Sequence, residues 1–249
     1  MERIILIETS TALCSVALAE DGTIVDYRES SAPKAHASLT AVFIQDMLAE
    51  RGLSPADCDA VCVSMGPGSY TGLRVGVSTA KGICFGARKP LLAVGTLDTL
   101  VAQAVDEIAT DSANPRNDKQ DTPDVIARSE TTNVIARSET TNVIARSEAT
   151  WQSPRYIQLT ETAPMIIDEN SFAEYLEQGP CLFIGDGAGK CADIIRHPNA
   201  SFCQCNPKAS SMLSPALAAY KEKRFEDVAY FEPFYLKEFV ATVSKKKLF

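Results

Sequence analysis

The chain has 249 residues, of which 45% are hydrophobic and 22% are charged. This length allows one large domain or two small ones, with enough apolar residues to bury a core. A net charge of −8 argues against independent binding of long nucleic acid, because phosphate binding requires clustered Lys and Arg. No apolar run approaches the ~20 residues that span a bilayer, so we expect no membrane association.

Cysteine and histidine usage argues against a structural metal site. The eight cysteines include no C-x-x-C pair, and the only two histidines are His36 and His197. We therefore expect no zinc site of the usual kind. The apolar stretch in residues 1–8 is too short for a secretory signal, so we expect free thiols and a cytoplasmic protein.

Residue patterns in the first 109 residues predict an α/β domain with a mixed sheet. Short apolar or alternating runs predict strands, and Asp21-Gly22 is a hairpin turn signal between two of them. Apolar residues at helical spacing predict the helices. The predicted strands are residues 4–7, 14–19, 23–27, 60–65 and 91–94, and the predicted helices are residues 37–51, 71–86 and 96–107.

A tandem repeat follows this domain. Residues 125–133 read VIARSETTN, residues 134–142 repeat them without change, and residues 143–151 read VIARSEATW. A period of nine places successive Val-Ile pairs on opposite faces of a helix or a strand, so the repeat does not fit a solenoid. Residues 110–155 also lack Leu and Phe. We therefore predict that residues 110–155 are a disordered insert without a function of its own.

A glycine-rich turn joins the predicted strand 60–65 to the predicted helix 71–86. Backbone N–H groups at the start of a helix suit a phosphate, and nearby hydroxyl groups can add donors. The Lys of a Walker motif is missing here, so phosphate binding and a tight packing turn both stay open. The candidate residues are Gly66, Gly68, Ser69, Thr71 and Gly72.

Two segments carry a resemblance to a known family. The first is Ile4-Ile5-Leu6-Ile7-Glu8-Thr9-Ser10, and the second is Gly66-Pro67-Gly68-Ser69-Tyr70-Thr71-Gly72-Leu73-Arg74. Together they resemble the TsaB (YeaZ) family of bacterial tRNA-modification subunits. Residues 183–188 and 233–237 are similar to weaker C-terminal signatures of that family. The resemblance covers residues 1–109 well and 165–240 more loosely, and it does not cover the repeat.

The resemblance implies an α/β fold of the actin-like ATPase (ribonuclease-H-like) type, with two subdomains built on mixed sheets. Residues 1–109 would form the N-terminal subdomain, residues 110–155 the disordered insert, and residues 156–249 the C-terminal subdomain with a C-terminal helix and tail. Family members carry an Asp-Ala-Arg strand after the helix 96–107, and residues 110–155 stand in its place. We therefore expect the C-terminal subdomain to lack strands.

The resemblance also implies a function. The chain would be a noncatalytic subunit that pairs with a TsaD-like threonylcarbamoyltransferase and serves with a TsaE-like ATPase to form N6-threonylcarbamoyladenosine at position 37 of tRNA. It would meet tRNA only through that complex and need no cofactor or metal of its own. A nucleotide at the partner interface and a homodimer of the isolated chain both stay open. The alternative function is an actin-like ATP-dependent enzyme or a peptidase that acts alone.

In the family, the first two helices form the pairing surface, which matches residues 37–51 and 71–86 here. The alternative interpretation is that the apolar residues of these two helices are ordinary core residues. The predicted interface residues are Leu39, Val42, Phe43, Met47, Leu73, Gly76, Val77 and Ala80.

Three further candidates have weaker support. Glu8 could orient a water or a metal ion, although family members more often have Asp at this position. Asp186 could face a nucleotide, but Asp186-Gly187 is equally a plain turn. Lys245–Lys247 is expected to be a solvated tail, with contact to tRNA phosphates as the alternative.

Overall fold

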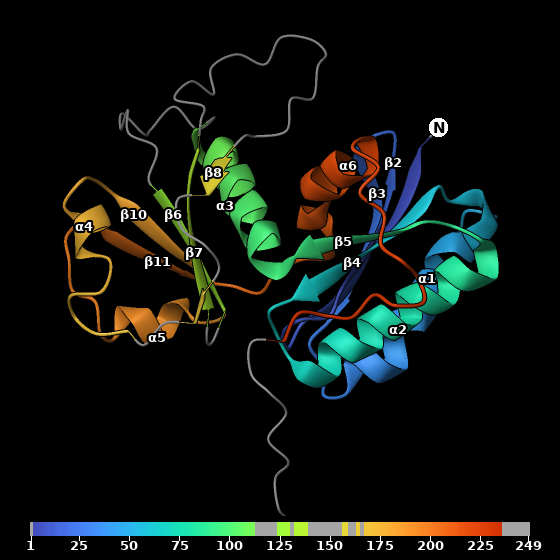
Figure 1. The fold of residues 1–249 in the computed structure, drawn as a ribbon, viewed down its shortest axis with the longest axis horizontal. Coiled ribbons are helices and arrows are strands. Elements are labelled where there is room, and N and C mark those ends of the chain that lie inside the picture. Colours follow the sequence, from blue (N-terminus) through green and yellow to red (C-terminus); the bar gives the residue numbers. More distant parts are fainter. Residues whose placement is uncertain are drawn as a thin grey trace, which may run out of the picture.

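Two β-sheets with their own covering helices form two lobes (Figure 1). The structure is a computed structural model, and it describes the backbone of residues 2–112, 124–129, 132–138, 156–158, 163–164 and 167–235. Side chains are described for residues 2–104 and 167–235. The α/β fold class predicted from the sequence is confirmed, with a mixed sheet in each lobe.

The first lobe is a five-stranded sheet in the order β3-β2-β1-β4-β5. β1, β4 and β5 run parallel, and β2 and β3 form an antiparallel hairpin beside them. All five predicted strands and all three predicted helices are present, within a few residues of the predicted bounds. Their bounds are β1 (Arg3–Glu8), β2 (Cys14–Glu20), β3 (Thr23–Ser30), α1 (Ala35–Ala49), β4 (Ala60–Gly66), α2 (Tyr70–Ala87), β5 (Leu91–Gly95) and α3 (Thr96–Ser112), with a short 3-10 helix η1 (Pro55–Asp57).

Helices cover both faces of this sheet, which explains why β1 is continuously apolar. Ile5 and Ile7 point to the side of α1 and α2, while Ile4 and Leu6 point to the opposite side. That opposite side is covered by η2 (Ala209–Met212) and α6 (Leu213–Lys221), which lie across the sheet from α1 and α2 in Figure 1. All four side chains are at most 1% exposed. Because successive side chains of a strand point to opposite faces, β1 contributes side chains to an apolar layer on each side of the sheet.

The second lobe is a sheet in the order β11-β10-β6-β7-β8, and β9 also pairs with β7. α3 lies between the lobes and packs its apolar stripe on Ile184 of β10 (Figure 1). The other face of β10 places Phe183 against α4 and α5, where its ring contacts Phe172 and Phe202. The bounds are β6 (Asp124–Ser129), β7 (Thr132–Ser138), β8 (Tyr156–Gln158), β9 (Ala163–Pro164), α4 (Ala173–Leu176), β10 (Cys181–Gly185), α5 (Ala188–Ala192) and β11 (Ala200–Gln204).

The repeat supplies two strands of this sheet, which corrects the prediction of a disordered insert for residues 124–129 and 132–138. β6 comes from the first copy and pairs parallel with β10, and β7 comes mainly from the second copy and pairs antiparallel with β6. The expected loss of strands from the C-terminal subdomain is therefore wrong. The rest of the predicted insert, apart from the end of α3, lies outside the described residues.

The C-terminal part of the chain corrects the predicted domain division. η2 and α6 belong to the apolar layer of the first lobe, and the Ala209 N–H donates to the hydroxyl group of Ser15 at 3.0 Å. The Glu226 N–H then donates to the carbonyl oxygen of Leu91 at 2.8 Å. Residues 209–235 therefore complete the first lobe, and the second lobe is inserted between α3 and η2.

Candidate functional site

The glycine-rich turn is closed by its own hydrogen bonds. Ser69 caps α2, since its hydroxyl oxygen accepts from the Gly72 N–H at 3.2 Å. The Ser69 N–H donates in turn to the carbonyl oxygen of Ser10 at 2.6 Å. Two of the amides that could face a phosphate are thus already bonded within the chain.

The glycines of this turn allow α2 to approach the segment that follows β1. A Cβ atom at Gly68 would lie 2.4 Å from the Ser10 carbonyl oxygen, and one at Gly72 would lie 2.1 Å from the Thr9 carbonyl oxygen. A Cβ atom at Gly76, one turn later, would lie 2.2 Å from Thr9 Oγ1. These contacts favour the packing interpretation of the turn. Phosphate binding at Gly66, Gly68, Ser69, Thr71 and Gly72 stays a prediction.

Glu8 ends β1 beside this turn as a fully buried carboxyl group. Its Oε1 atom accepts from the Ser10 N–H at 2.7 Å and from the Ser64 hydroxyl group at 3.0 Å. Within the described part of the chain, Oε2 has no hydrogen-bond partner. Burial raises the pKa of Glu8 to about 7, although the hydrogen bonds favour the charged form. Near pH 7 the buried Glu8 side chain is therefore a mixture of the protonated and the ionised form.

The C-terminal segment 226–235 runs along the turn and α2, which the sequence did not predict. The Phe234 N–H donates to the Met65 carbonyl oxygen at 2.7 Å, and Lys81 Nζ donates to the carbonyl oxygens of residues 229 and 231 at 3.0 and 3.1 Å. The ring of Tyr235 lies 4.8 Å from the ring of Tyr70, between centroids. Residues 66–74 and residues 233–235, the described part of a weaker family signature, are therefore neighbours in space.

Five of the eight predicted interface residues are buried in the core of the first lobe. Met47, Leu73 and Ala80 have no exposed surface, Val77 is 5% exposed, and Gly76 is buried against Thr9. The interface prediction does not hold for these five, which are core residues, the alternative that the sequence left open.

The remaining three predicted interface residues lie on the outer side of α1. Val42 is 42% exposed, and Leu39 and Phe43 are half-buried. On α2 the exposed side carries Ser78, Gly82 and Phe85, and Phe85 is 83% exposed. Sequence periodicity missed Phe85 because it lies outside the apolar stripe of α2 that packs on the sheet. The interface prediction at Leu39, Val42 and Phe43 is compatible with this exposure.

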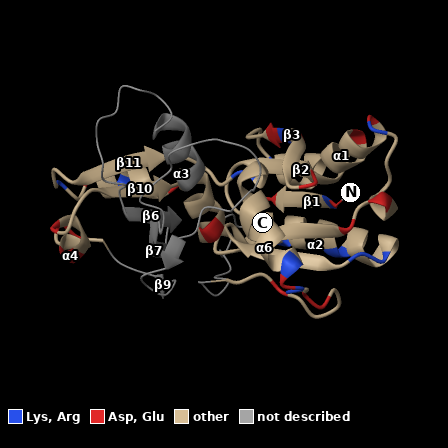
Figure 2. Cartoon of the chain, turned by 90° about the horizontal axis from the view of Figure 1, so that it is seen from above, with Lys and Arg blue, Asp and Glu red and all other residues tan. Residues whose placement is uncertain are grey.

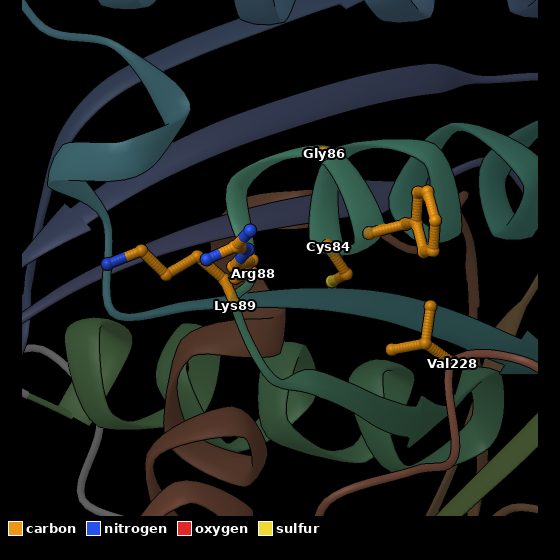
Figure 3. A pocket seen from close by; sticks show the side chains of 6 residues that line it. Cys84, Gly86, Arg88, Lys89 and Val228 are labelled. Carbon is orange, nitrogen blue, oxygen red and sulfur yellow. The ribbon is translucent and has the colours of Figure 1, made fainter.

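A shallow pocket lies at the C-terminal end of α2 (Figure 3). Arg88 is the C-cap residue and has a left-handed backbone conformation. The residues that line the pocket are Cys84, Phe85, Gly86, Arg88, Lys89 and Val228. Lys and Arg residues and Asp and Glu residues are both found over the first lobe (Figure 2).

The two histidines lie in different lobes. His36 on α1 has its Nε2 atom 2.9 Å from the Thr11 carbonyl oxygen, and His197 Nδ1 lies 3.2 Å from the Asn199 backbone nitrogen. Among the residues that the structure describes, no group of three His, Cys, Asp or Glu side chains could hold a metal ion. Asp186 is half-buried in the turn between β10 and α5, where its carbonyl oxygen accepts from the Gln204 side chain at 2.8 Å. Lys245–Lys247 lie outside the described residues.

No helix in the described part of the chain is long and apolar enough to cross a membrane.

The sequence model of the family described as "TsaD: tRNA N6-adenosine threonylcarbamoyltransferase" matches residues 29–117. A protein of Escherichia coli named tRNA threonylcarbamoyladenosine biosynthesis protein TsaB is 40% identical over 102 residues, which are 41% of this chain and 44% of that protein. The protein of the same name from Haemophilus influenzae is 38% identical over 105 residues, 42% of this chain and 44% of its own length.

The sequence matches therefore span less than half of the length of these curated relatives. A solved structure, YeaZ from Pseudomonas aeruginosa, covers 95% of this chain and all of its own chain, with a TM-score of 0.74 and 21% sequence identity. The structural likeness thus extends over nearly the whole chain, whereas each of these sequence matches covers less than half of it. The chain is similar in sequence to TsaB proteins over about 100 residues, and it has the fold of YeaZ.

Proposed function

We propose that this chain is a noncatalytic subunit that pairs with a TsaD-like threonylcarbamoyltransferase. The pair would form N6-threonylcarbamoyladenosine at position 37 of tRNA. The names of the TsaB relatives and the TsaD family match support this assignment. The observation that carries it is the outer side of α1 and α2, which exposes Val42 and Phe85 although the inner side already fills the core.

A noncatalytic role is supported by how the turn at residues 66–74 is built. Backbone N–H groups bind a phosphate only where they are not already bonded within the chain. Here the Ser69 N–H donates to the Ser10 carbonyl oxygen and the Gly72 N–H donates to the Ser69 hydroxyl oxygen, while Glu8 Oε1 accepts from Ser10 and Ser64. These residues support the packing of α2 on β1.

The proposed partner surface is defined by the apolar side chains of α1 and α2 that are exposed to solvent. Val42 on α1 and Phe85 on α2 expose apolar surface, and Leu39 and Phe43 on α1 are half-buried. On α2, Ser78 and Gly82 are exposed, and a Cβ atom at Gly82 would meet nothing within 4 Å. Small residues allow a second helix to approach closely. The same surface would serve a homodimer of the isolated chain, which light scattering would detect.

Co-purification of the full chain with a TsaD-like partner tests the proposal. Val42→Asp and Phe85→Asp place a charge on the proposed surface and should each reduce retention of the partner by at least tenfold. Ile194→Asp is the matched control, since Ile194 is 40% exposed and lies in the second lobe. Retention that falls equally for the control, or not at all for Val42→Asp and Phe85→Asp, would reject this surface.

The TsaE-like ATPase would join as a third component, and tRNA would bind only to the assembled complex. No cofactor is proposed for the isolated chain, and a nucleotide would bind only at the partner interface. The alternative is an enzyme that acts alone. Micromolar binding of ATP by the isolated chain in calorimetry, with turnover, would favour that alternative.

A further inference from the structure

The pocket at the C-terminal end of α2 has an apolar end and a basic end. Figure 3 shows Arg88 and Lys89 on one side of Cys84 and Val228 on the other. The pocket has a volume of about 530 Å³ and is open to solvent. Small-molecule sites bury most of the surface of their ligand, which an open pocket does not do. A protruding part of another protein suits this pocket better.

The apolar end of the pocket is fixed by the core of the first lobe. Cys84 is 1% exposed, and its thiol group donates to the Pro90 carbonyl oxygen at 3.5 Å. Burial raises the pKa of Cys84 to about 11, so the thiol group is neutral near pH 7 and adds no charge to the pocket. Val228 is half-buried and packs against the same core cluster, whereas Phe85 is 83% exposed. This end of the pocket is therefore an apolar floor beside one large uncovered ring.

The basic end carries a cation without a counterion in the described part of the chain. The Cys84 carbonyl oxygen accepts from the backbone N–H groups of Arg88 and Lys89, so the end of α2 needs no side-chain donor. The Arg88 side chain is exposed, and within the described residues it makes no hydrogen bond and no ion pair. Lys89 is less free. Hydrogen bonds from Ser54 lower the pKa of the Asp57 carboxyl group, and the nearby charge of Lys89 adds to this effect.

Arg88 also has a backbone conformation that disfavours arginine. It is the C-cap residue of α2, with φ 55° and ψ 47° in the left-handed region. Glycine is the usual residue where a helix ends in this conformation, because a Cβ atom is sterically disfavoured there. A basic charge near the end of a helix is mildly stabilising, but Lys89 already supplies one. The stability of α2 therefore does not account for Arg88, whereas a contact with a partner does.

We propose that this pocket holds an acidic side chain of the TsaD-like partner, with an adjacent apolar side chain of the partner packed beside Phe85. This inference rests on the proposed function, and it extends the partner surface from Phe85, which belongs to both. Arg88 would hold the carboxylate group through two parallel N–H···O bonds, a geometry that lysine cannot provide. Arginine and large aromatic residues also contribute most to the affinity of many protein interfaces.

Co-purification of the full chain with the TsaD-like partner in low and high salt tests the proposal. Arg88→Glu places a like charge opposite the acidic side chain and should reduce retention in low salt by at least tenfold. Arg88→Lys keeps the charge and should retain more of the partner than Arg88→Glu does. High salt should weaken retention of the parent chain more than that of Arg88→Gly, since salt screens the charged pair. Arg196→Glu is the matched control, because Arg196 is exposed and lies in the second lobe.

Arg88→Gly separates a partner contact from a role in folding. Glycine suits the left-handed conformation, so the melting temperature of the isolated chain should be unchanged or higher while retention of the partner falls. A lower melting temperature together with the lost retention would mean that Arg88 acts in folding, and the proposal would be wrong.

Val42→Asp distinguishes this inference from the proposed function, since Val42 lies on α1 and does not line the pocket. If Val42→Asp releases the partner and Arg88→Glu does not, the proposed function stands and the pocket proposal is wrong. If the parent chain does not retain the partner, the proposed function is wrong and so is the occupant named here. If Arg88→Glu alters dimerisation of the isolated chain in light scattering but not retention of the partner, the occupant is a second copy of the chain, which also overturns the proposal.

Discussion

The buried carboxyl group of Glu8 predicts a specific pH dependence of stability. Its pKa is 4.5 in an ordinary environment and about 7 in the folded protein. Because the folded state holds the proton more tightly, the stabilisation is complete below about pH 4.5 and is lost as the pH rises through 7. Integration of this linkage gives a loss of about 2–3 kcal/mol between pH 5 and pH 8.

Glu8→Gln removes this titration and keeps an oxygen that can accept from Ser10 and Ser64. The variant adds an amide group where Oε2 has no partner, and this changes stability by a constant amount at every pH. We therefore expect the stability difference between variant and parent to shift by about 2–3 kcal/mol in favour of the variant from pH 5 to pH 8.

Urea unfolding followed by circular dichroism at pH 5, 6, 7 and 8 measures this shift. Glu177→Gln is the control, since this carboxyl group is exposed and its removal should leave the pH dependence unchanged. A constant stability difference between Glu8→Gln and the parent across this range would refute the reasoning. It would mean that Glu8 stays ionised in the folded protein.

Two further predictions concern packing in the first lobe. Gly72→Ala should destabilise the protein by about 3 kcal/mol or more, because its Cβ atom would lie 2.1 Å from the Thr9 carbonyl oxygen. Gly82→Ala on the same helix meets nothing within 4 Å and should stabilise it by about 0.5–1 kcal/mol. If Gly72→Ala and Gly82→Ala changed the stability equally in thermal melts, the packing role of the turn would be contradicted. Phe231→Ala should cost about 3 kcal/mol in urea unfolding, since this ring is 9% exposed and fills the core under segment 226–235. A loss below about 1 kcal/mol would show that the segment is not anchored there.

The elements of the first lobe could be predicted because each one is encoded locally. The run of residues 4–7 is apolar on both faces, and Asp21-Gly22 marks the hairpin. Ser54 before Pro55 is a further local signal, and the structure has a capping box of Ser54 with Asp57 there. Such signals depend on neighbours in the sequence, so no knowledge of the rest of the chain is needed.

The repeat was misinterpreted for a physical reason. The argument from its period of nine assumes that one helix or strand continues from copy to copy. The chain instead reverses direction between β6 and β7, so the first two copies supply separate strands and the odd period no longer moves their side chains to the wrong face. A pattern of three apolar residues is short, and β6 becomes a strand because β10 and β7 flank it.

The candidate interface shows a second limit of prediction from the sequence. Val77 and Val42 are both apolar residues at helical spacing, yet Val77 is 5% exposed and Val42 is 42% exposed. Periodicity identifies an apolar stripe but does not show whether a sheet or a partner covers it. That distinction depends on the packing of α1 and α2 against the same sheet, which is a tertiary property.

The chain order separates the repeat from the proposed partner surface. The second lobe leaves the first after α3 and returns at η2, while residues 209–235 complete the first lobe and pack along α2. The proposed partner surface on α1 and α2 lies wholly in the first lobe. A change in the number of repeat copies should therefore alter the second sheet without moving Val42 or Phe85. The chain that lacks residues 134–142 should retain a TsaD-like partner as well as the full chain does, and a loss of retention would show that the two lobes are coupled through α3.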